Sequence, residues 1–248
     1  HFVFSHQNKI IKKLIVIEGP TASGKTALGV ALAKHWNTVV VSADSRQFYR
    51  ETSIGTAKPM PEEQDGIMHY FVDSHSIHEP LTSAQYEKQA LEILDKEFQH
   101  HDIILMVGGS GLFIDAVCNG LDDIPNDETE FFAKTDLQNP VRIIRALEVI
   151  RISGKPFSSF QAFNPKQRPF EIQKFVIDLP RETLYERINL RVDIMMQNGL
   201  LEEVRSLIPW KDLQALNTVG YSELFDYFDG KTTLEEAVEL IKRNSRRY

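Results

Sequence analysis

Eight consecutive residues, Gly19 to Thr26, have the types and the spacing that bind a phosphate group. They fit the P-loop pattern G-x-x-x-x-G-K-[ST], in which glycines let the backbone curl so that its N–H groups face phosphate oxygens. Lys25 supplies a positive charge, and the hydroxyl of Thr26 is a suitable ligand for Mg²⁺. The predicted set that binds a diphosphate or a nucleotide is Gly19, Pro20, Thr21, Ala22, Ser23, Gly24, Lys25 and Thr26.

A second polar segment, Ser42 to Tyr49, reads Ser-Ala-Asp-Ser-Arg-Gln-Phe-Tyr and follows an apolar run. Ligands of open α/β sheets bind beyond the carboxyl ends of the strands, so this segment is expected beside the phosphate site. Asp44 is a candidate general base, Mg²⁺ ligand or helix N-cap, and the local pattern favours the cap. Arg46 and Gln47 are residue types that hydrogen-bond phosphates or base edges.

Short apolar runs are expected to form the strands that position these segments. Residues 14–17, 39–41 and 103–107 are apolar on both faces, which predicts buried strands, and a further strand is expected at 175–179. Helical spacing follows at 25–34, at about 84–100 behind Ser83 as N-cap, at 112–117 and in the part from Arg181 onward. Strand, turn and helix alternate, which predicts an α/β fold with a parallel sheet flanked by helices and a helical C-terminal part.

The bulk composition is that of a globular protein. The chain has 248 residues, one cysteine (Cys118) and a net charge of -7. No segment has the roughly 18 uninterrupted apolar residues of a membrane span, and residues 1–13 lack the layout of a signal peptide. We therefore expect a cytoplasmic protein with no membrane partner. The basic residues near 142–155 and 242–247 are as compatible with solvated helix faces as with a polyanion site.

The order of several motifs is more specific than any one of them. The segments GPTASGKT (19–26), SADSRQFY (42–49), IGTAKP (54–59), GGSGLF (108–113), RIIRALEVIRISGKP (142–156) and GLLEEVRSL (199–207) follow one another along the chain. In this order they resemble the tRNA dimethylallyltransferases, bacterial enzymes of the IPP transferase family with a P-loop NTPase-like core. The resemblance implies transfer of a dimethylallyl group from dimethylallyl diphosphate to N6 of the adenine just 3′ of the anticodon, in tRNAs that read codons starting with U. It also implies Mg²⁺ as cofactor and a monomer.

The resemblance assigns roles residue by residue. Asp44 matches the acceptor of the N6 proton, Lys25 belongs to the catalytic set, and Ser110 stands where the family usually has a threonine whose hydroxyl supports the reacting centre. A diphosphate-binding arginine is implied at Arg187 or Arg191, and the choice stays open. The implied tRNA-binding residues are Asp44, Ser45, Arg46, Gln47, Ser110, Val141, Arg142, Ile143, Ile144 and Arg145.

Two departures from the family concern its length. The family usually has a helical insertion of several tens of residues where this chain has only 126–141, so the insertion is either truncated or not included in the sequence. The family also continues beyond Tyr248 with a basic helix. The expected division is a P-loop core at 1–121, a remnant of the insertion at 122–140, and the rest of the core with the helical region at 141–248.

Three other functions use the same loop. The same prenyl transfer could act on free adenine nucleotides, although the matches at 44–47 and 141–145 count against it. A kinase would bind ATP in the P-loop. A nucleotide-dependent switch is the third alternative, but the chain has no Asn-Lys-x-Asp segment for reading guanine.

Overall fold

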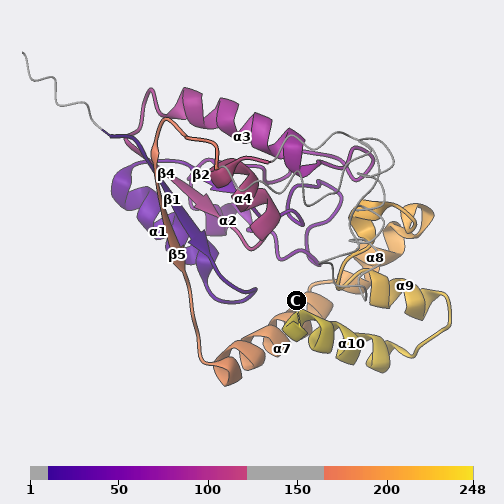
Figure 1. Ribbon diagram of the computed structural model, residues 1–248. Coiled ribbons are helices and arrows are strands. Elements are labelled where there is room, and N and C mark those ends of the chain that lie inside the picture. Colours follow the sequence, from indigo (N-terminus) through magenta and orange to yellow (C-terminus); the bar gives the residue numbers. More distant parts are fainter. Residues whose placement is uncertain (1–10, 122–164, 248) are drawn as a thin grey trace, which may run out of the picture. The chain divides into compact units, whose positions relative to one another are not determined.

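A five-stranded parallel sheet forms the centre of the computed structural model, which describes residues 11–121 and 165–247 (Figure 1). Its strand order is β3-β2-β4-β1-β5, and every pair of neighbours is parallel. The strands are β1 (Lys13–Glu18), β2 (Val40–Ser42), β3 (His69–Tyr70), β4 (Ile103–Val107) and β5 (Glu171–Val176). The predicted α/β class is therefore confirmed.

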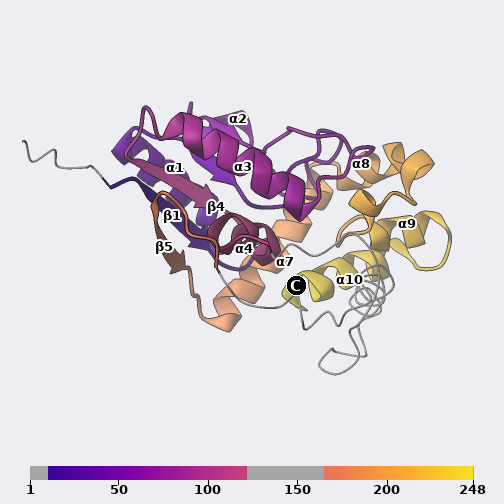
Figure 2. The ribbon, with the colours of Figure 1, turned by 45° about the horizontal axis from the view of Figure 1, so that its top comes forward.

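Helices follow most of the strands, as the alternation in the sequence predicts. They are α1 (Lys25–Trp36), α2 (Pro61–Gln64), α3 (Ser83–Glu97), α4 (Gly111–Asn119), α7 (Arg181–Gln197), α8 (Leu200–Ser206), α9 (Ser222–Phe228) and α10 (Leu234–Arg247), with short 3-10 helices at Ile208–Trp210 and Gln214–Leu216. In Figure 2, α1 and α3 lie on opposite sides of the sheet. The helical C-terminal part is confirmed, and α10 packs against α7 and α9.

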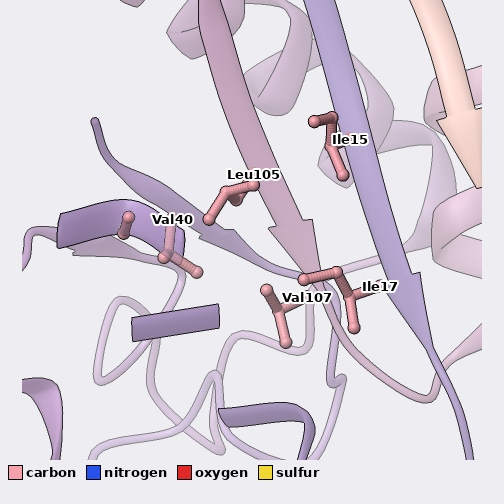
Figure 3. Close-up of a cluster of buried hydrophobic side chains, with 6 residues drawn as sticks. Ile15, Ile17, Val40, Leu105 and Val107 are labelled. Atoms are coloured by element: carbon pink, nitrogen blue, oxygen red, sulfur yellow. The ribbon is translucent and has the colours of Figure 1, made fainter. Parts of the chain in front are cut away.

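The face of the sheet toward α1 is a continuous apolar layer. Ile15 pairs with Leu105 and Ile17 with Val107 in the strand register, so their side chains form rows on one face (Figure 3). A Cβ added to Gly29 of α1 would lie 2.8 Å from a methyl group of Val107. Only glycine permits this approach, which brings the helix after the P-loop close against the strand β4.

Two local predictions are wrong in position. The fourth predicted strand, at 175–179, lies instead at Glu171–Val176, because the β5 residues pair along the whole of β1 although most of them are exposed. An edge strand does not need the continuous apolar run that marks a buried one. The cap of α3 is Thr82 rather than Ser83, since the hydroxyl of Thr82 accepts a hydrogen bond from the amide of Gln85 in a capping box.

The chain divides into two compact units, residues 1–114 with 169–248, and residues 115–168. The first unit contains the sheet, the P-loop at 19–26 and the polar segment at 42–49. In the second, Arg168 Nε donates to the carbonyl oxygen of Val117 at 2.8 Å. The predicted division at 121 and 140 stays a prediction. Within the ranges 11–121 and 165–247, no helix is both long and apolar enough to cross a membrane.

Candidate active site

The loop between β1 and α1 has the shape of a phosphate cradle. Its backbone is left-handed at Ala22 (φ 62°) and at Gly24 (φ 94°), which turns successive amides of the loop. The N-terminus of α1 begins at Lys25, so the partial positive charge of the helix adds to the loop amides. Lys25 Nζ donates to the carbonyl oxygens of Gly19 and Pro20, both at 2.7 Å, and so lies across the loop.

Arg191 of α7 is the second cation at the loop. Its Nη1 donates to Thr21 Oγ1 at 3.2 Å, which ties a residue 170 positions away to the phosphate cradle. Arg187, one turn earlier on α7, is exposed and does not line the cavity described below. Of the two arginines that the sequence leaves open, Arg191 is the one that lines the cavity, and its binding of diphosphate stays a prediction.

The two cations influence each other and a nearby carboxylate. Burial lowers the pKa of Lys25, the charge of Asp44 raises it, and the charge of Arg191 lowers it. Burial likewise lowers the pKa of Arg191, whereas Glu63 and Asp44 raise it. The charge of Arg191 thus disfavours the charged form of Lys25, and both cations are partly out of water, so an anionic ligand in the cavity would stabilise their charged forms.

Asp44 follows the carboxyl end of β2, beside the P-loop. No helix begins there, so the favoured local interpretation of Asp44 as a helix N-cap is wrong. Its Oδ1 accepts a hydrogen bond from the amide of Arg46 at 3.2 Å within a turn, and its carbonyl oxygen accepts one from the amide of Gln47 at 2.9 Å. The turn leaves the carboxylate on the wall of the cavity.

Ser110 connects the end of β4 to the same turn. Its Oγ accepts from the amide of Ser45 at 2.9 Å and lies 3.0 Å from Ser45 Oγ. Its own amide donates to the carbonyl oxygen of Ala43 at 3.1 Å. Because β2 and β4 are neighbours in the sheet, these bonds fix the hydroxyl of Ser110 next to Asp44.

Arg46 and Gln47 use their side chains to hold backbone. Arg46 Nη2 donates to the carbonyl oxygens of Gly55 at 2.7 Å and Val219 at 2.6 Å, while its buried Nε has no protein partner. Gln47 Nε2 donates to the carbonyl oxygen of Ala57 at 3.2 Å. Their predicted contacts with tRNA stay a prediction, and the structure gives both residues a role in shaping the cavity wall.

All these groups meet in one cavity of about 220 Å³. Most of the predicted residues line it, and its lining is Gly19, Pro20, Thr21, Ala22, Ser23, Gly24, Lys25, Thr26, Ala27, Asp44, Arg46, Gln47, Thr56, Ala57, Pro59, Glu63, Gly109, Ser110 and Arg191. Ser45 lies behind the wall, bonded to Ser110. Val141, Arg142, Ile143, Ile144 and Arg145 lie outside the described residues.

Six residues of this lining are not among the predicted site residues: Ala27, Thr56, Ala57, Pro59, Glu63 and Gly109. Four of them lie in the motifs IGTAKP at 54–59 and GGSGLF at 108–113, which is the sequence signal that marks them, and Ala27 directly follows the P-loop. Glu63 is an exposed residue of α2 with no motif to mark it.

The cavity suits a magnesium ion bound together with a phosphate. The hydroxyl of Thr26 and the carboxylates of Asp44 and Glu63 line it, and oxygen ligands of this kind are what Mg²⁺ prefers beside phosphates. Within the described ranges no group of three or more His, Cys, Asp or Glu side chains forms a metal site. The donors present therefore fit an ion that arrives with its ligand rather than an ion held by protein alone.

A family model described as IPP transferase matches residues 47–137 and 128–248 of the chain. The tRNA dimethylallyltransferase of Cytophaga hutchinsonii is 45% identical over 266 residues, covering 96% of this chain and 88% of that protein. The alignment is longer than this chain, so the relative has residues that the chain lacks. The tRNA dimethylallyltransferase 1 of Phocaeicola vulgatus is also 45% identical, with 95% and 87% covered.

Solved structures show the same similarity. The tRNA isopentenylpyrophosphate transferase of Bacillus halodurans superposes with a TM-score of 0.76 at 33% sequence identity. That comparison covers 96% of this chain and 84% of the other. The arrangement of strands and helices is thus shared by a protein that differs at about two thirds of the aligned positions.

Proposed function

The chain belongs to the IPP transferase family, and we propose that it transfers a dimethylallyl group from dimethylallyl diphosphate to N6 of the adenine just 3′ of the anticodon in tRNA. Family membership confirms the resemblance that the ordered motifs predicted. One observation carries the reaction: Asp44, a carboxylate at the end of β2, lines the same cavity as the P-loop and Arg191. A proton acceptor and an anion cradle therefore face one small space.

The phosphate side of the cavity would bind the leaving group. The loop amides, Lys25 and Arg191 would hold the diphosphate and stabilise the negative charge that grows on it as the allylic C–O bond breaks. Thr26 would bind Mg²⁺ through its hydroxyl, and the ion would supply further positive charge there. Such charge stabilisation matters most for an allylic carbon, because the bond to the leaving group breaks early and leaves cationic character on the carbon.

The part of the cavity lined by Asp44 and Ser110 would receive the acceptor. The amine N6 is a weak nucleophile because its lone pair is delocalised into the purine ring, so it needs a base when the new C–N bond forms. Asp44 would accept the N6 proton, and Ser110 would fix its hydroxyl beside the reacting atoms. The adenine has to leave its stack to reach the cavity, and the single-stranded anticodon loop lowers that cost.

The proposal includes the setting of the reaction. One polypeptide supplies the P-loop, Asp44, Ser110 and Arg191, so the chemistry needs no second copy, and we propose a monomer. The tRNA substrate is consistent with a cytoplasmic enzyme. The tRNAs concerned would be those that read codons starting with U, as the family resemblance implies.

Mass spectrometry of a synthetic anticodon stem-loop tests the proposal. The protein is incubated with the RNA, Mg²⁺ and dimethylallyl diphosphate, and parallel samples contain ATP in place of the allylic donor or AMP in place of the RNA. We expect the RNA to gain the mass of one dimethylallyl group only when the allylic donor is present. Modified AMP with unmodified RNA, or consumption of ATP with no modified RNA, would overturn the proposal.

A further inference from the structure

Residues 53–57 contribute to the cavity wall, and hydrogen bonds from distant parts of the chain fix their backbone conformation. Thr56 and Ala57 line the cavity, and Ala57 has a left-handed backbone with φ 50°. A non-glycine residue adopts this conformation only when its surroundings enforce it. Within the segment, the amide of Ala57 donates to the carbonyl oxygen of Ile54 at 3.0 Å.

The carboxylate of Glu203, on helix α8, supports this segment from a distant part of the chain. Its Oε2 accepts from the amides of Ser53 at 3.0 Å and Ile54 at 2.8 Å, and its Oε1 accepts from the amide of Gly55 at 3.0 Å. Three consecutive amides therefore converge on one carboxylate from a different part of the chain. A carboxylate that accepts several N–H groups forms charge-assisted bonds that are stronger than neutral ones.

Tyr221 holds that carboxylate in place. Its hydroxyl donates to Glu203 Oε1 at 2.6 Å, and its fully buried ring packs against Gly55, where an added Cβ would come within 2.7 Å of the ring. Burial and the charge of Glu203 both raise the pKa of Tyr221, so the hydroxyl stays a donor. The contact explains why position 55 is a glycine.

The support continues to the residues beside the proton acceptor. Arg46 bonds the carbonyl oxygens of Gly55 and Val219, and so links the turn of Asp44 to both sides of the Glu203 contact. Gln47 bonds the carbonyl oxygen of Ala57. Among the residues that the structure describes, no hydrogen bond or ion pair joins Glu203 or Tyr221 to the P-loop.

We propose that Glu203, with Tyr221, is a positioning residue that sets the acceptor wall of the cavity, formed by residues 53–57 and the turn 44–47. The inference rests on the proposed function, because the wall faces the acceptor only if the P-loop holds the leaving group. Glu203 touches no reacting atom. It acts through the backbone of 53–57, and its loss misplaces the wall while the phosphate cradle stays intact.

The variant Glu203→Gln tests the inference, with Glu202→Gln as its matched control. The replacement turns one acceptor oxygen into a donor, so at least one of the amides at 53–55 loses its partner. Glu202 is the adjacent residue of α8, but it is exposed and pairs with Arg205 at 2.8 Å. Both variants lose one negative charge from the same helix, and only one of them touches the wall.

Three measurements separate positioning from a general loss of structure. We expect Glu203→Gln to lower kcat for prenylation of the anticodon stem-loop about 10²-fold, the scale of a 1 Å misplacement. Its dissociation constant for inorganic diphosphate with Mg²⁺, measured by calorimetry, should stay within about two-fold of the wild-type value, because the P-loop makes no bond to Glu203. Amide hydrogen exchange should accelerate in the peptide that spans 53–57, and Glu202→Gln should match wild type in all three measurements.

Tyr221→Phe replaces Glu203→Gln if the latter is unfolded at the assay temperature. It removes only the hydroxyl that donates to Glu203, and we expect kcat to fall about 10-fold with unchanged diphosphate binding, the low end of the scale for a hydrogen bond to a charged group. Wild-type kcat in the folded variant, or an equal loss of kcat and of diphosphate affinity, would overturn the inference. Wild-type protein that leaves the RNA unmodified would overturn the proposed function instead.

Discussion

The two sides of the cavity are built in different ways. Most of the phosphate side is a single run, Gly19 to Thr26, whose shape comes from its own backbone and from the helix that follows, and Arg191 joins it from α7. The acceptor side combines the turn 44–47, the segment 53–57 and Ser110, and it depends on Glu203 and Tyr221 from more than a hundred positions away. The phosphate side is thus mostly local in the sequence, whereas the acceptor side is assembled by the tertiary fold.

This difference predicts a division of effects between variants. Changes on the phosphate side should weaken binding of the diphosphate, because they remove groups that touch it. Changes on the acceptor side should lower turnover and leave diphosphate binding nearly unchanged. A phosphate-side variant that lowers only turnover, or an acceptor-side variant that weakens diphosphate binding, would contradict this division.

The largest difference between the loss of kcat and the loss of diphosphate affinity is expected for Asp44→Ala. Loss of a general base typically costs 10²–10⁴-fold in rate, so we expect kcat to fall about 10³-fold. The affinity for inorganic diphosphate should stay the same or rise slightly, because the variant removes a negative charge near Lys25. Single-turnover kinetics and calorimetry measure the two quantities, and equal losses in both would show that Asp44 has a structural role.

Lys25→Ala should show the opposite behaviour. We expect diphosphate affinity and kcat/KM to fall together by about 10²-fold, because the charge that binds the leaving group is lost. Burial lowers the pKa of Lys25, so in wild type its share of the affinity should fall as pH rises, starting below the usual lysine value of about 10.5. Calorimetry at several pH values should show a steeper loss for wild type than for Lys25→Ala, and parallel curves would contradict this role.

The pair Arg191→Ala and Arg187→Ala tests which arginine serves the phosphate side. Arg191 bonds Thr21 of the loop and lines the cavity, whereas Arg187 is exposed. We expect about a 30-fold loss of diphosphate affinity for Arg191→Ala, within the range for removing a charged donor, and less than about two-fold for Arg187→Ala. Equal effects, or a larger effect at Arg187, would contradict the placement of the two side chains.

Among the residues that line the cavity, the smallest loss of function is expected for Ser110. Ser110→Ala leaves the amide of Ser45 without its acceptor, so we expect kcat to fall about 10-fold with unchanged diphosphate binding. Ser110→Thr keeps the hydroxyl and should stay within about three-fold of wild type. Rate measurements on both variants decide the point, since a threonine variant as slow as the alanine variant would show that shape, and not the hydroxyl, matters at this position.

The sequence predicts the parts of the fold that have a local pattern, as the phosphate side has, and misses parts that depend on contacts between distant segments. The P-loop, the buried strands β1, β2 and β4 and the helical C-terminal part were predicted, because each has a local pattern of apolar residues or glycines. The edge strand β5 was misplaced, since its exposed side chains carry no such pattern. The two-residue strand β3 is too short to leave one.

For the site, the sequence identified Asp44, Lys25 and Ser110 through motifs but left Arg187 and Arg191 undecided. These two lie one turn apart on α7, so their spacing cannot show which of them faces the loop; tertiary packing decides it. Glu203 stood inside a matched motif with no role, because its partners at 53–55 are about 150 positions away. Contacts between distant segments of this kind leave no trace in local patterns.

Phosphorus NMR of the complete reaction tests the central claim most directly, namely that the P-loop holds a leaving group and transfers no phosphoryl group. Wild-type protein is mixed with Mg²⁺, dimethylallyl diphosphate and an anticodon stem-loop, and the phosphorus signals are followed while the mass of the RNA is measured. The account predicts that intact inorganic diphosphate appears in a one-to-one ratio with prenylated RNA. Release of inorganic monophosphate, or a phosphorylated acceptor, would contradict it.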